Sequence, residues 1–365
     1  MPAWQLTKDC IWNSFRSSGK RHLLITGSRS SGKTRLLTSL AGGKLPGITT
    51  WAEPGKAVYL RENTTGRQIQ IGIFHAALPG KDQKMMPAVY GFAALGIPAL
   101  KRCIQWEGEW ISLDEIGYLE LSFGEYRQGL LRLLDCKRVI AVVRKQDHPF
   151  LLSLLGREDA FVVDTDSPFG DSACVIMASG MGKRFGGSKL LAPFAGKPML
   201  GWTLEATRGL FRRRLVVTRS QEAAAYCREQ GVEVLLHSQP HRNDALRLGL
   251  EAAAPADHCL FCPADQPLLS RDTVMALLLL GQNLPDAIVR PGFQNVPGAP
   301  ILFPARDYPE LSTLPEGKGG SYVAAGHPDR VHLLPVADEK ELLDVDTRER
   351  LEQLEGLYAA APQGY

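Results

Sequence analysis

The sequence lacks an apolar run long enough to cross a membrane. Its longest such run, residues 274–280, has seven residues and is followed by Gly281, whereas a membrane-spanning helix needs about 20. The first residues include Lys8 and Asp9 and contain no apolar segment of the kind found in secretory signals. We therefore expect a cytoplasmic protein with no membrane partner.

An excess of charge of one sign is also missing, and cysteines are few. The 42 Lys and Arg against 39 Asp and Glu give a net charge of +3, too small to favour nucleic-acid binding, and no zinc-finger, RNP or basic-arm pattern occurs. Seven scattered cysteines indicate free thiols in a reducing compartment. Cys259 and Cys262 lie within one apolar strand candidate, where they point to opposite faces, so we expect core residues rather than zinc ligands.

What the sequence does contain is an alternation of short apolar runs with helical patterns, which is typical of α/β folds. Its 365 residues suit two domains. The alternation stops at residues 164–171, where Pro168, Gly170 and three Asp indicate a linker. We predict two three-layer α/β/α domains, at residues 1–168 and 169–365. The predicted strands are 22–26, 68–74, 109–113, 138–143, 160–163, 173–177, 215–218, 232–237, 259–262, 287–290, 301–303 and 331–336.

The first motif lies at residues 27–34, which read Gly-Ser-Arg-Ser-Ser-Gly-Lys-Thr between an apolar strand and a helical run. This is the P-loop pattern G-x-x-x-x-G-K-[ST]. Its backbone N–H groups form an anion-binding nest at a helix N-terminus, which suits the phosphates of ATP or GTP. We expect Lys33 on the β- and γ-phosphates and the Thr34 hydroxyl on Mg²⁺. The predicted nucleotide contacts are Gly27, Ser31, Gly32, Lys33 and Thr34.

A P-loop needs a carboxylate at the end of a neighbouring strand to hold the metal. Asp114 would orient Mg²⁺ there, and Glu115 would polarise the attacking water. With residues 114–121 as the second motif, residues 20–165 resemble a family of small nucleoside-triphosphatases. Residues 29–31 lack the extra Gly or Pro expected in such loops, so we expect slow turnover. The side chain of Arg144 either supplies positive charge to the transition state or, more simply, is solvated at the end of a strand.

A third motif, a glycine-rich loop, follows the predicted strand 173–177. It contains Gly-x-Gly, which also occurs in dinucleotide-binding folds. The charge of the surrounding residues distinguishes a triphosphate site from a dinucleotide site. Arg184 and Lys189 belong to a stretch, residues 172–204, that has no Asp or Glu. This uncompensated positive charge favours a triphosphate over a dinucleotide bridge. The predicted nucleotide contacts are Ala178, Ser179, Gly180, Gly182 and Gly186.

Two later carboxylates are candidate metal ligands for this second site. Asp265 follows the predicted strand 259–262, at the sheet edge where α/β proteins bind ligands. Asp346 precedes the last predicted helix and is either a second ligand or, like Thr347, an N-cap. A cation is needed because a triphosphate and an anionic acceptor repel each other. The sequence thus predicts Mg²⁺ on Asp265, assisted by Asp346 unless that residue caps the helix.

Five separated blocks within residues 173–352 resemble the molybdenum cofactor nucleotidyltransferases, within the wider MobA-like nucleotidyltransferase fold. The resemblance implies a Rossmann-like nucleotidyltransferase domain that follows the P-loop NTPase domain. The blocks are the loop 178–189, the run 193–200, Asp265-Gln266-Pro267, Gly298-Ala299-Pro300 and Asp344-Val345-Asp346-Thr347.

The same resemblance implies transfer of CMP from CTP to Mo-molybdopterin, which yields the cytosine dinucleotide cofactor and pyrophosphate. Ser179, a small side chain before Gly180, is typical of cytidylyl-transferring members, so CTP is favoured over GTP. A molybdenum hydroxylase such as a xanthine dehydrogenase-type enzyme would be the client. The catalytic residues would be Arg184, Lys189 and Asp265 in the second domain and Glu115 in the first.

Other functions stay open on the sequence alone. A guanylyltransferase or a sugar-phosphate nucleotidyltransferase would use the same fold. A nucleotide-controlled cofactor-insertion chaperone would bind CTP without releasing pyrophosphate. The first domain would, as a nucleotide kinase, phosphorylate an acceptor rather than water.

Overall fold

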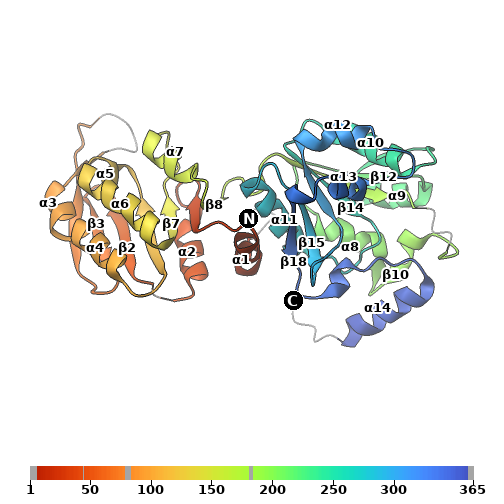
Figure 1. Cartoon of the computed structure of the whole chain (residues 1–365), viewed down its shortest axis with the longest axis horizontal. Helices are drawn as coiled ribbons and strands as arrows, with labels where there is room; N and C mark the ends of the chain where they lie inside the picture. The colour runs from red at the N-terminus through yellow and green to blue at the C-terminus, as the bar shows by residue number, and fades with distance from the viewer. Residues whose placement is uncertain (1–5, 44, 79–83, 181–183, 361–365) are drawn as a thin grey trace. The chain divides into compact units, whose positions relative to one another are not determined.

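The computed structural model describes residues 6–43, 45–78, 84–180 and 184–360. The chain forms two compact units, residues 19–168 and residues 1–18 together with 169–365 (Figure 1). Each unit is built on an eight-stranded sheet with a mainly parallel core, which is the predicted fold class. Among the described residues, no helix combines the length and apolarity needed to span a membrane.

The N-terminal unit has a parallel core in the order β2-β6-β7-β1-β8, extended by antiparallel β3, β4 and β5. The strands are β1 (His22–Thr26), β2 (Gly47–Glu53), β3 (Ala57–Glu62), β4 (Gln68–Phe74), β5 (Met85–Pro87), β6 (Trp110–Ile116), β7 (Arg138–Val143) and β8 (Ala160–Asp164). The helices are α2 (Lys33–Ala41), α3 (Val89–Gly91), η1 (Phe92–Gly96), α4 (Ile97–Gln105), α5 (Tyr118–Leu121), α6 (Gly124–Cys136) and α7 (Pro149–Leu155).

Helices cover both faces of this sheet, which is why its central strands are apolar throughout. All five residues of β1 are buried. Leu24 packs into a core with residues of α4 and α6, while α2 contacts β1, β6 and β7 and contributes no residue to that core. Since strand side chains alternate between faces, a strand buried on both sides reads as a continuous apolar run.

The hairpin formed by β2 and β3 was not predicted. Pro54 and Gly55 form its turn, in which Lys56 donates its backbone N–H to the Glu53 carbonyl over 3.0 Å and Gly55 has φ +71°. Pro followed by Gly at the centre of a turn is a recognised sequence signal for a β-turn, so this hairpin could have been predicted from the sequence.

The C-terminal unit has the strand order β13-β12-β9-β14-β17-β15-β16, with β18 beside β15. Its strands are β9 (Ser172–Ala178), β10 (Pro193–Phe194), β11 (Lys197–Pro198), β12 (Arg213–Thr218), β13 (Glu233–Leu236), β14 (His258–Pro263), β15 (Ile288–Phe293), β16 (Val296–Pro297), β17 (Ile301–Pro304) and β18 (Val331–Pro335). Its helices are α1 (Lys8–Ser17), η2 (Lys189–Leu191), α8 (Met199–Ala206), α9 (Gln221–Glu229), α10 (Arg242–Ala253), α11 (Arg271–Asn283), η3 (Ala305–Asp307), α12 (Tyr308–Ser312), α13 (Gly320–Gly326), η4 (Pro328–Arg330), η5 (Glu339–Leu342) and α14 (Arg348–Ala360).

Strands β9, β12, β13 and β14 run parallel, and β17 is antiparallel to both β14 and β15. The carboxyl ends of β9, β14 and β15 therefore lie at the same edge of the sheet. This edge is where α/β proteins place their ligands.

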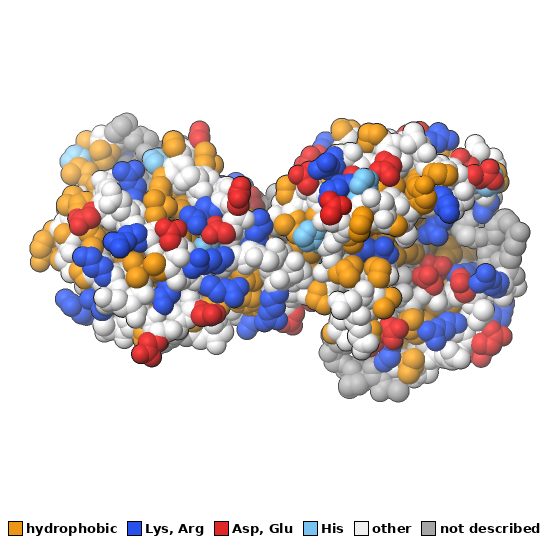
Figure 2. All heavy atoms as spheres, in the orientation of Figure 1, with side chains coloured by type: hydrophobic (Ala, Val, Ile, Leu, Met, Phe, Trp, Pro, Cys, Tyr) orange, Lys and Arg blue, Asp and Glu red, His pale blue; other side chains and the backbone are white. Residues whose placement is uncertain are grey.

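The distribution of charged side chains and the burial of the cysteines agree with what the composition predicts. Basic and acidic side chains are interspersed over the face of both units that Figure 2 shows, as a net charge of +3 implies. Cys259 and Cys262 are buried, free thiols in β14, which confirms the prediction of core residues. Burial raises the pKa of both thiols, so neither is a reactive thiolate.

Residues 1–18 depart from the domain boundary expected at residues 1–168. Within this segment, α1 (Lys8–Ser17) packs on α11 and β18 of the C-terminal unit. The Ser14 hydroxyl donates to the Ala276 carbonyl over 2.9 Å, and the Thr7 hydroxyl donates to Asp272 over 2.8 Å. The apolar face of α1, with Ile11 and Phe15, is buried. A helix of ten residues carries no sequence signal for the surface that covers it.

Truncating Phe15 tests this assignment. Because the ring is 1% exposed, we expect Phe15→Ala to destabilise the C-terminal unit by about 3–5 kcal/mol and to leave the N-terminal unit unchanged. Hydrogen exchange of β9 and β7 peptides, measured against denaturant concentration, reports each unit separately. Lys8→Ala, at an exposed position of the same helix, is the control. Equal loss of protection in β7 would contradict the assignment.

Candidate functional site

The P-loop joins β1 to α2, and residues near the ends of β8 and β6 contact it. Gly27 has φ +142°, and a Cβ there would lie 2.0 Å from the Thr165 hydroxyl oxygen, so only glycine fits. The Thr34 hydroxyl donates to Asp114 Oδ1 over 3.1 Å. Lys33 Nζ donates to the carbonyl oxygens of Gly27 (3.1 Å) and Ser28 (2.6 Å). The structure thus brings Lys33, Thr34 and Asp114 to one place, with Gly32 at the N-cap of α2.

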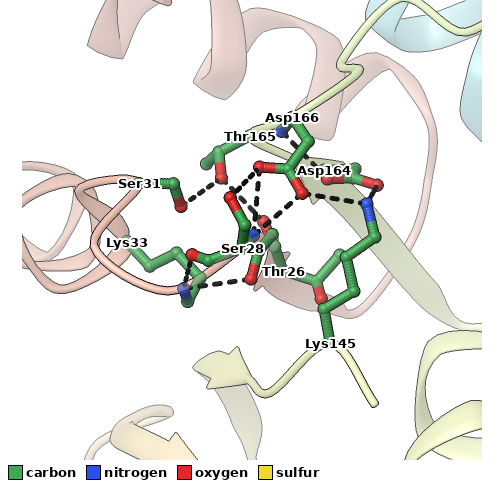
Figure 3. A network of polar contacts seen from close by, with 9 residues as sticks. Thr26, Ser28, Ser31, Lys33, Lys145, Asp164, Thr165 and Asp166 are labelled. Carbon is green, nitrogen blue, oxygen red and sulfur yellow. Dashed lines mark hydrogen bonds and ion pairs between the residues drawn. The ribbon is translucent and has the colours of Figure 1, made fainter. Parts of the chain in front are cut away.

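The residues after β8 bind this loop directly (Figure 3). Ser28 donates its backbone N–H to both carboxylate oxygens of Asp166, over 3.0 and 2.8 Å, and its hydroxyl to Oδ1 over 2.8 Å. These bonds, together with Lys145, lower the pKa of Asp166 to about 2. The hydroxyls of Thr165 and Ser31 lie 2.7 Å apart. The interpretation of residues 164–171 as a linker is therefore wrong for 164–166. Thr165 and Asp166 in this segment form hydrogen bonds with the P-loop.

The carboxylates at the end of β6 lie in different surroundings. Asp114 is 7% exposed, and burial raises its pKa against the opposing hydrogen bond from Thr34. The Thr50 hydroxyl lies 3.1 Å from both the backbone N and O of Glu115. Within the described part of the chain, the half-buried Glu115 carboxylate has no hydrogen bond or ion pair. Arg144 stacks its guanidinium over Tyr118, 5.4 Å from the ring centroid.

Glu120 closes the turn that follows Asp114 and Glu115. Its side chain accepts the Gly117 backbone N–H over 2.9 Å at the start of α5, which is the carboxylate half of a capping box. The residue is 4% exposed. Burial raises the pKa of its carboxyl from 4.5 to about 7, although the backbone hydrogen bonds act in the opposite direction. Glu120 therefore shapes the turn that carries both carboxylates.

In the C-terminal unit, Lys189 joins the two predicted metal ligands. Its Nζ donates to Asp265 Oδ2 over 2.7 Å and to Asp346 Oδ1 over 2.8 Å. The Lys189 side chain is only 10% exposed. Burial alone would lower its pKa, but the hydrogen bonds and charges of the two carboxylates raise it. Arg184, with an 82% exposed side chain, approaches Asp346 Oδ2 to 3.7 Å.

The cap of the last helix is Thr347 rather than Asp346. The Thr347 hydroxyl accepts the Arg350 backbone N–H over 3.2 Å and so caps α14. Asp346 is thereby left to pair with Lys189, whose hydrogen bond lowers the pKa of that carboxyl. Asp344 is held by Gln266, which donates its side-chain N–H to Oδ1 over 3.0 Å.

A cavity of about 530 Å³ lies beside these charges. It extends from Lys189 and Gly186 to Ala178, Ser179 and Gly180, so five of the residues predicted from the second loop line one hollow. Gly182, also predicted there, lies outside the described residues.

Sequence reasoning missed Arg219, which also lines this cavity, and His237, which contacts Ser179. Arg219 donates to the Ser179 carbonyl over 2.7 and 3.0 Å. His237 Nδ1 accepts the Gln239 backbone N–H over 3.2 Å, so the neutral ring carries its proton on Nε2, which lies 2.8 Å from the Ser179 hydroxyl. Burial and then the charge of Arg219 lower the pKa of His237. Both residues follow strand ends, but no motif marks them.

The donor set around Lys189 suits a divalent cation. The two carboxylates already hold one positive charge in common. Over the described ranges, no group of three or more His, Cys, Asp or Glu forms a complete metal site. Mg²⁺ is commonly bound by one or two carboxylates together with substrate phosphates and water, so an incomplete protein set fits that ion.

Comparison with known proteins agrees with this division. Residues 174–331 match the family model of the MobA-like NTP transferase domain, and residues 56–167 match that of an NTPase. The molybdenum cofactor cytidylyltransferase of Escherichia coli K12 is 27% identical over 134 residues, 35% of this chain and 68% of that protein. The nucleoside-triphosphatase THEP1 of Thermotoga sp. RQ2 is 27% identical over 150 residues, 39% of this chain and 84% of that protein.

A third relative is the bifunctional protein GlmU of Rhizorhabdus wittichii RW1, 36% identical over 135 residues. The match covers 34% of this chain and 29% of GlmU, so the chain spans less than a third of that relative's length. Taken together, the comparisons find an NTPase segment and a nucleotidyltransferase segment in one chain.

Titration of Glu120 makes a pH prediction. The folded protein keeps this proton up to about pH 7, whereas the unfolded chain loses it near the ordinary value of 4.5, so this group's stabilisation is present at low pH and is lost as pH rises through that window. Glu120→Gln keeps an acceptor for Gly117 but cannot titrate. We expect the variant to gain about 3 kcal/mol relative to wild type between pH 4.5 and pH 7.

Urea unfolding across this pH range, monitored on the N-terminal unit, measures the effect. Glu125→Gln, at an exposed site in α6, is the control and should follow wild type. Parallel pH profiles for wild type and Glu120→Gln would contradict the assignment.

Proposed function

We propose that the protein is a bifunctional enzyme of molybdenum cofactor maturation. Its C-terminal unit transfers CMP from CTP to Mo-molybdopterin, and its N-terminal unit hydrolyses a nucleoside triphosphate. The observation that carries the first part is the Lys189 bridge between Asp265 and Asp346, at the rim of a cavity lined by a glycine-rich loop. The match to a molybdenum cofactor cytidylyltransferase supports the choice of substrate.

The transfer needs no general base on the protein. The terminal phosphate of the acceptor has a second pKa near 6, so at neutral pH its oxygens are already nucleophilic. One of them forms a bond to the α-phosphorus of CTP while the bond from that phosphorus to the bridging oxygen breaks, and pyrophosphate leaves. Catalysis then consists of holding the anions in line and neutralising their charge.

Named residues divide this work. Lys189 and Arg184 neutralise the triphosphate, and the backbone N–H groups of Gly180 and Gly186 orient it. When bound, Mg²⁺ supplies positive charge to the reacting and leaving oxygens, and Asp265 and Asp346 would hold it. Ser179 at the far end of the cavity contacts the base; its hydroxyl is positioned by His237 and by the Val217 carbonyl, 3.1 Å away.

The N-terminal unit fits triphosphate hydrolysis. Lys33 and the amides of Gly27, Ser31 and Gly32 bind the phosphates. Thr34 and Asp114, already hydrogen-bonded to each other, would hold Mg²⁺, which supplies charge to the phosphates. The Glu115 carboxylate, with no hydrogen bond from the described residues, polarises water. Hydrolysis would time the handover of the finished cofactor to a molybdenum hydroxylase, such as a xanthine dehydrogenase-type enzyme.

Incubation with Mg²⁺, Mo-molybdopterin and either CTP or GTP tests the proposal directly. We expect the cytosine dinucleotide and one pyrophosphate per product. A guanine dinucleotide would correct the base, and product formed only with a sugar 1-phosphate would replace the acceptor. Tight CTP binding without pyrophosphate would indicate a chaperone instead.

Asp265→Asn should disable only the transfer. Loss of a carboxylate that holds the cation removes several kcal/mol of charge stabilisation, so we expect pyrophosphate release to fall by about 10²- to 10³-fold. Triphosphate hydrolysis by the N-terminal unit should persist. Asp286→Asn, which removes an exposed carboxylate paired with Arg306, is the matched control. Loss of both activities in Asp265→Asn would refute two independent sites.

Lys33→Ala should give the reciprocal result. Without its ammonium group the P-loop loses the charge on the β- and γ-phosphates, and we expect hydrolysis to fall by about 10²-fold or more while CMP transfer stays within about twofold. Lys101→Ala, at an exposed site of α4, controls for the loss of one positive charge. Orthophosphate and pyrophosphate assays on the same samples separate the two reactions. Unchanged orthophosphate release would overturn the role of the P-loop.

A further inference from the structure

Arg290 is a half-buried cation that no carboxylate of the described residues neutralises. It lies in β15, two residues after the fully buried Ile288. Its Nε donates to the Gly298 carbonyl over 2.8 Å, but across the described ranges no carboxylate forms an ion pair with its guanidinium. Burial alone lowers the pKa of this group, and no neighbouring charge raises it. A desolvated guanidinium usually has an anionic partner.

The position of Arg290 links it to the proposed transfer site. β14 and β15 run in the same direction, because both are antiparallel to β17. The register places Arg290 level with Phe261 of β14, four residues before Asp265. Gly298 lies beside Leu342, because a Cβ at Gly298 would come within 2.8 Å of Leu342 Cδ1. The Leu342 carbonyl in turn accepts the side-chain N–H of Gln266 over 3.1 Å. Arg290 is thus connected, through Gly298 and Leu342, to Gln266, the residue next to Asp265.

The strand order places Arg290 on the opposite side of Asp265 from the glycine-rich loop. That loop and Lys189 follow β9, on one side of β14, whereas β17 and β15 lie on the other side. A nucleotide held by the loop therefore leaves the β15 side for the second reactant. The planar fork of a guanidinium suits two oxygens of one phosphate or carboxylate group, and a reactant that attacks phosphorus as a phosphate monoester carries such a group.

We propose that Arg290 binds the phosphate monoester of the acceptor and positions it for attack. This inference rests on the proposed nucleotidyl transfer and deepens it, because it assigns the acceptor's anionic group to a specific residue. The bond to Gly298 fixes Nε and so presents the two terminal nitrogens of the guanidinium to the ligand. Arg290 then supplies the counter-charge that keeps the acceptor phosphate beside the triphosphate despite their mutual repulsion.

Direct binding is tested on the whole protein with methyl phosphate as the probe. Nitrogen-15 spectra of the arginine side chains follow the Arg290 Nε–H, identified by its loss in Arg290→Lys. We expect a saturable shift of this signal with methyl phosphate and none with sodium chloride at equal ionic strength. The Arg306 signal, from an exposed residue paired with Asp286, should not move. A shift absent from Arg290, or reproduced by chloride, would overturn the inference.

Kinetics then test positioning. Arg290→Lys keeps the charge but loses the fork, so we expect the KM for Mo-molybdopterin to rise roughly 10- to 100-fold with the KM for CTP unchanged; Arg306→Lys should match wild type. An unchanged acceptor KM in a variant of normal melting temperature would overturn the inference. If Mo-molybdopterin is not a substrate but the methyl phosphate shift occurs, the phosphate site stands and only the acceptor's identity in the proposed function falls.

Discussion

A single ammonium group holds together the charges on which the C-terminal site depends. Lys189 is nearly buried and bonds to both Asp265 and Asp346, and these arrive from segments about 80 residues apart. Charges in such a setting repay their desolvation only when paired. A triphosphate that draws Lys189 toward its phosphates would therefore release two carboxylates together, and a divalent cation would be favoured at that moment. Nucleotide and metal binding should support each other for this electrostatic reason.

The N-terminal site is organised differently, by backbone and short polar side chains. Gly27 is pressed against Thr165, and Ser28 is held by Asp166 (Figure 3). The conformation of the P-loop is thus stabilised by residues that lie outside the motif and directly follow β8. Lys145 bonds to Asp164 and Asp166 and completes this support. The two nucleotide sites of the chain are therefore stabilised differently. Ion pairs of a largely buried lysine organise the C-terminal site, and hydrogen bonds to the P-loop organise the N-terminal site.

Motifs and periodicity predicted much of this structure because their causes are local. The strand at 22–26 and the P-loop after it were predicted because burial on both faces makes a continuous apolar run and a phosphate nest needs glycine. The role of Asp346 stayed open because a cap and a ligand have the same local sequence. The hydrogen bond from Arg350 assigns the cap to Thr347, and the role of Asp346 as a metal ligand stays a prediction. The places of α1 and of residues 164–166 depend on tertiary packing, as do Arg219 and Arg290, which no motif marks.

In the nucleotide-free protein, the ammonium group of Lys189 lies between two carboxylates, where a divalent cation would bind. Titration of the nucleotide-free protein with Mn²⁺, followed by the electron paramagnetic resonance of the free ion, tests it most directly. Removing the competing ammonium in Lys189→Met should strengthen Mn²⁺ binding by at least about tenfold, and adding Asp265→Asn to that variant should abolish the gain. Equal or weaker Mn²⁺ binding by Lys189→Met would contradict the account.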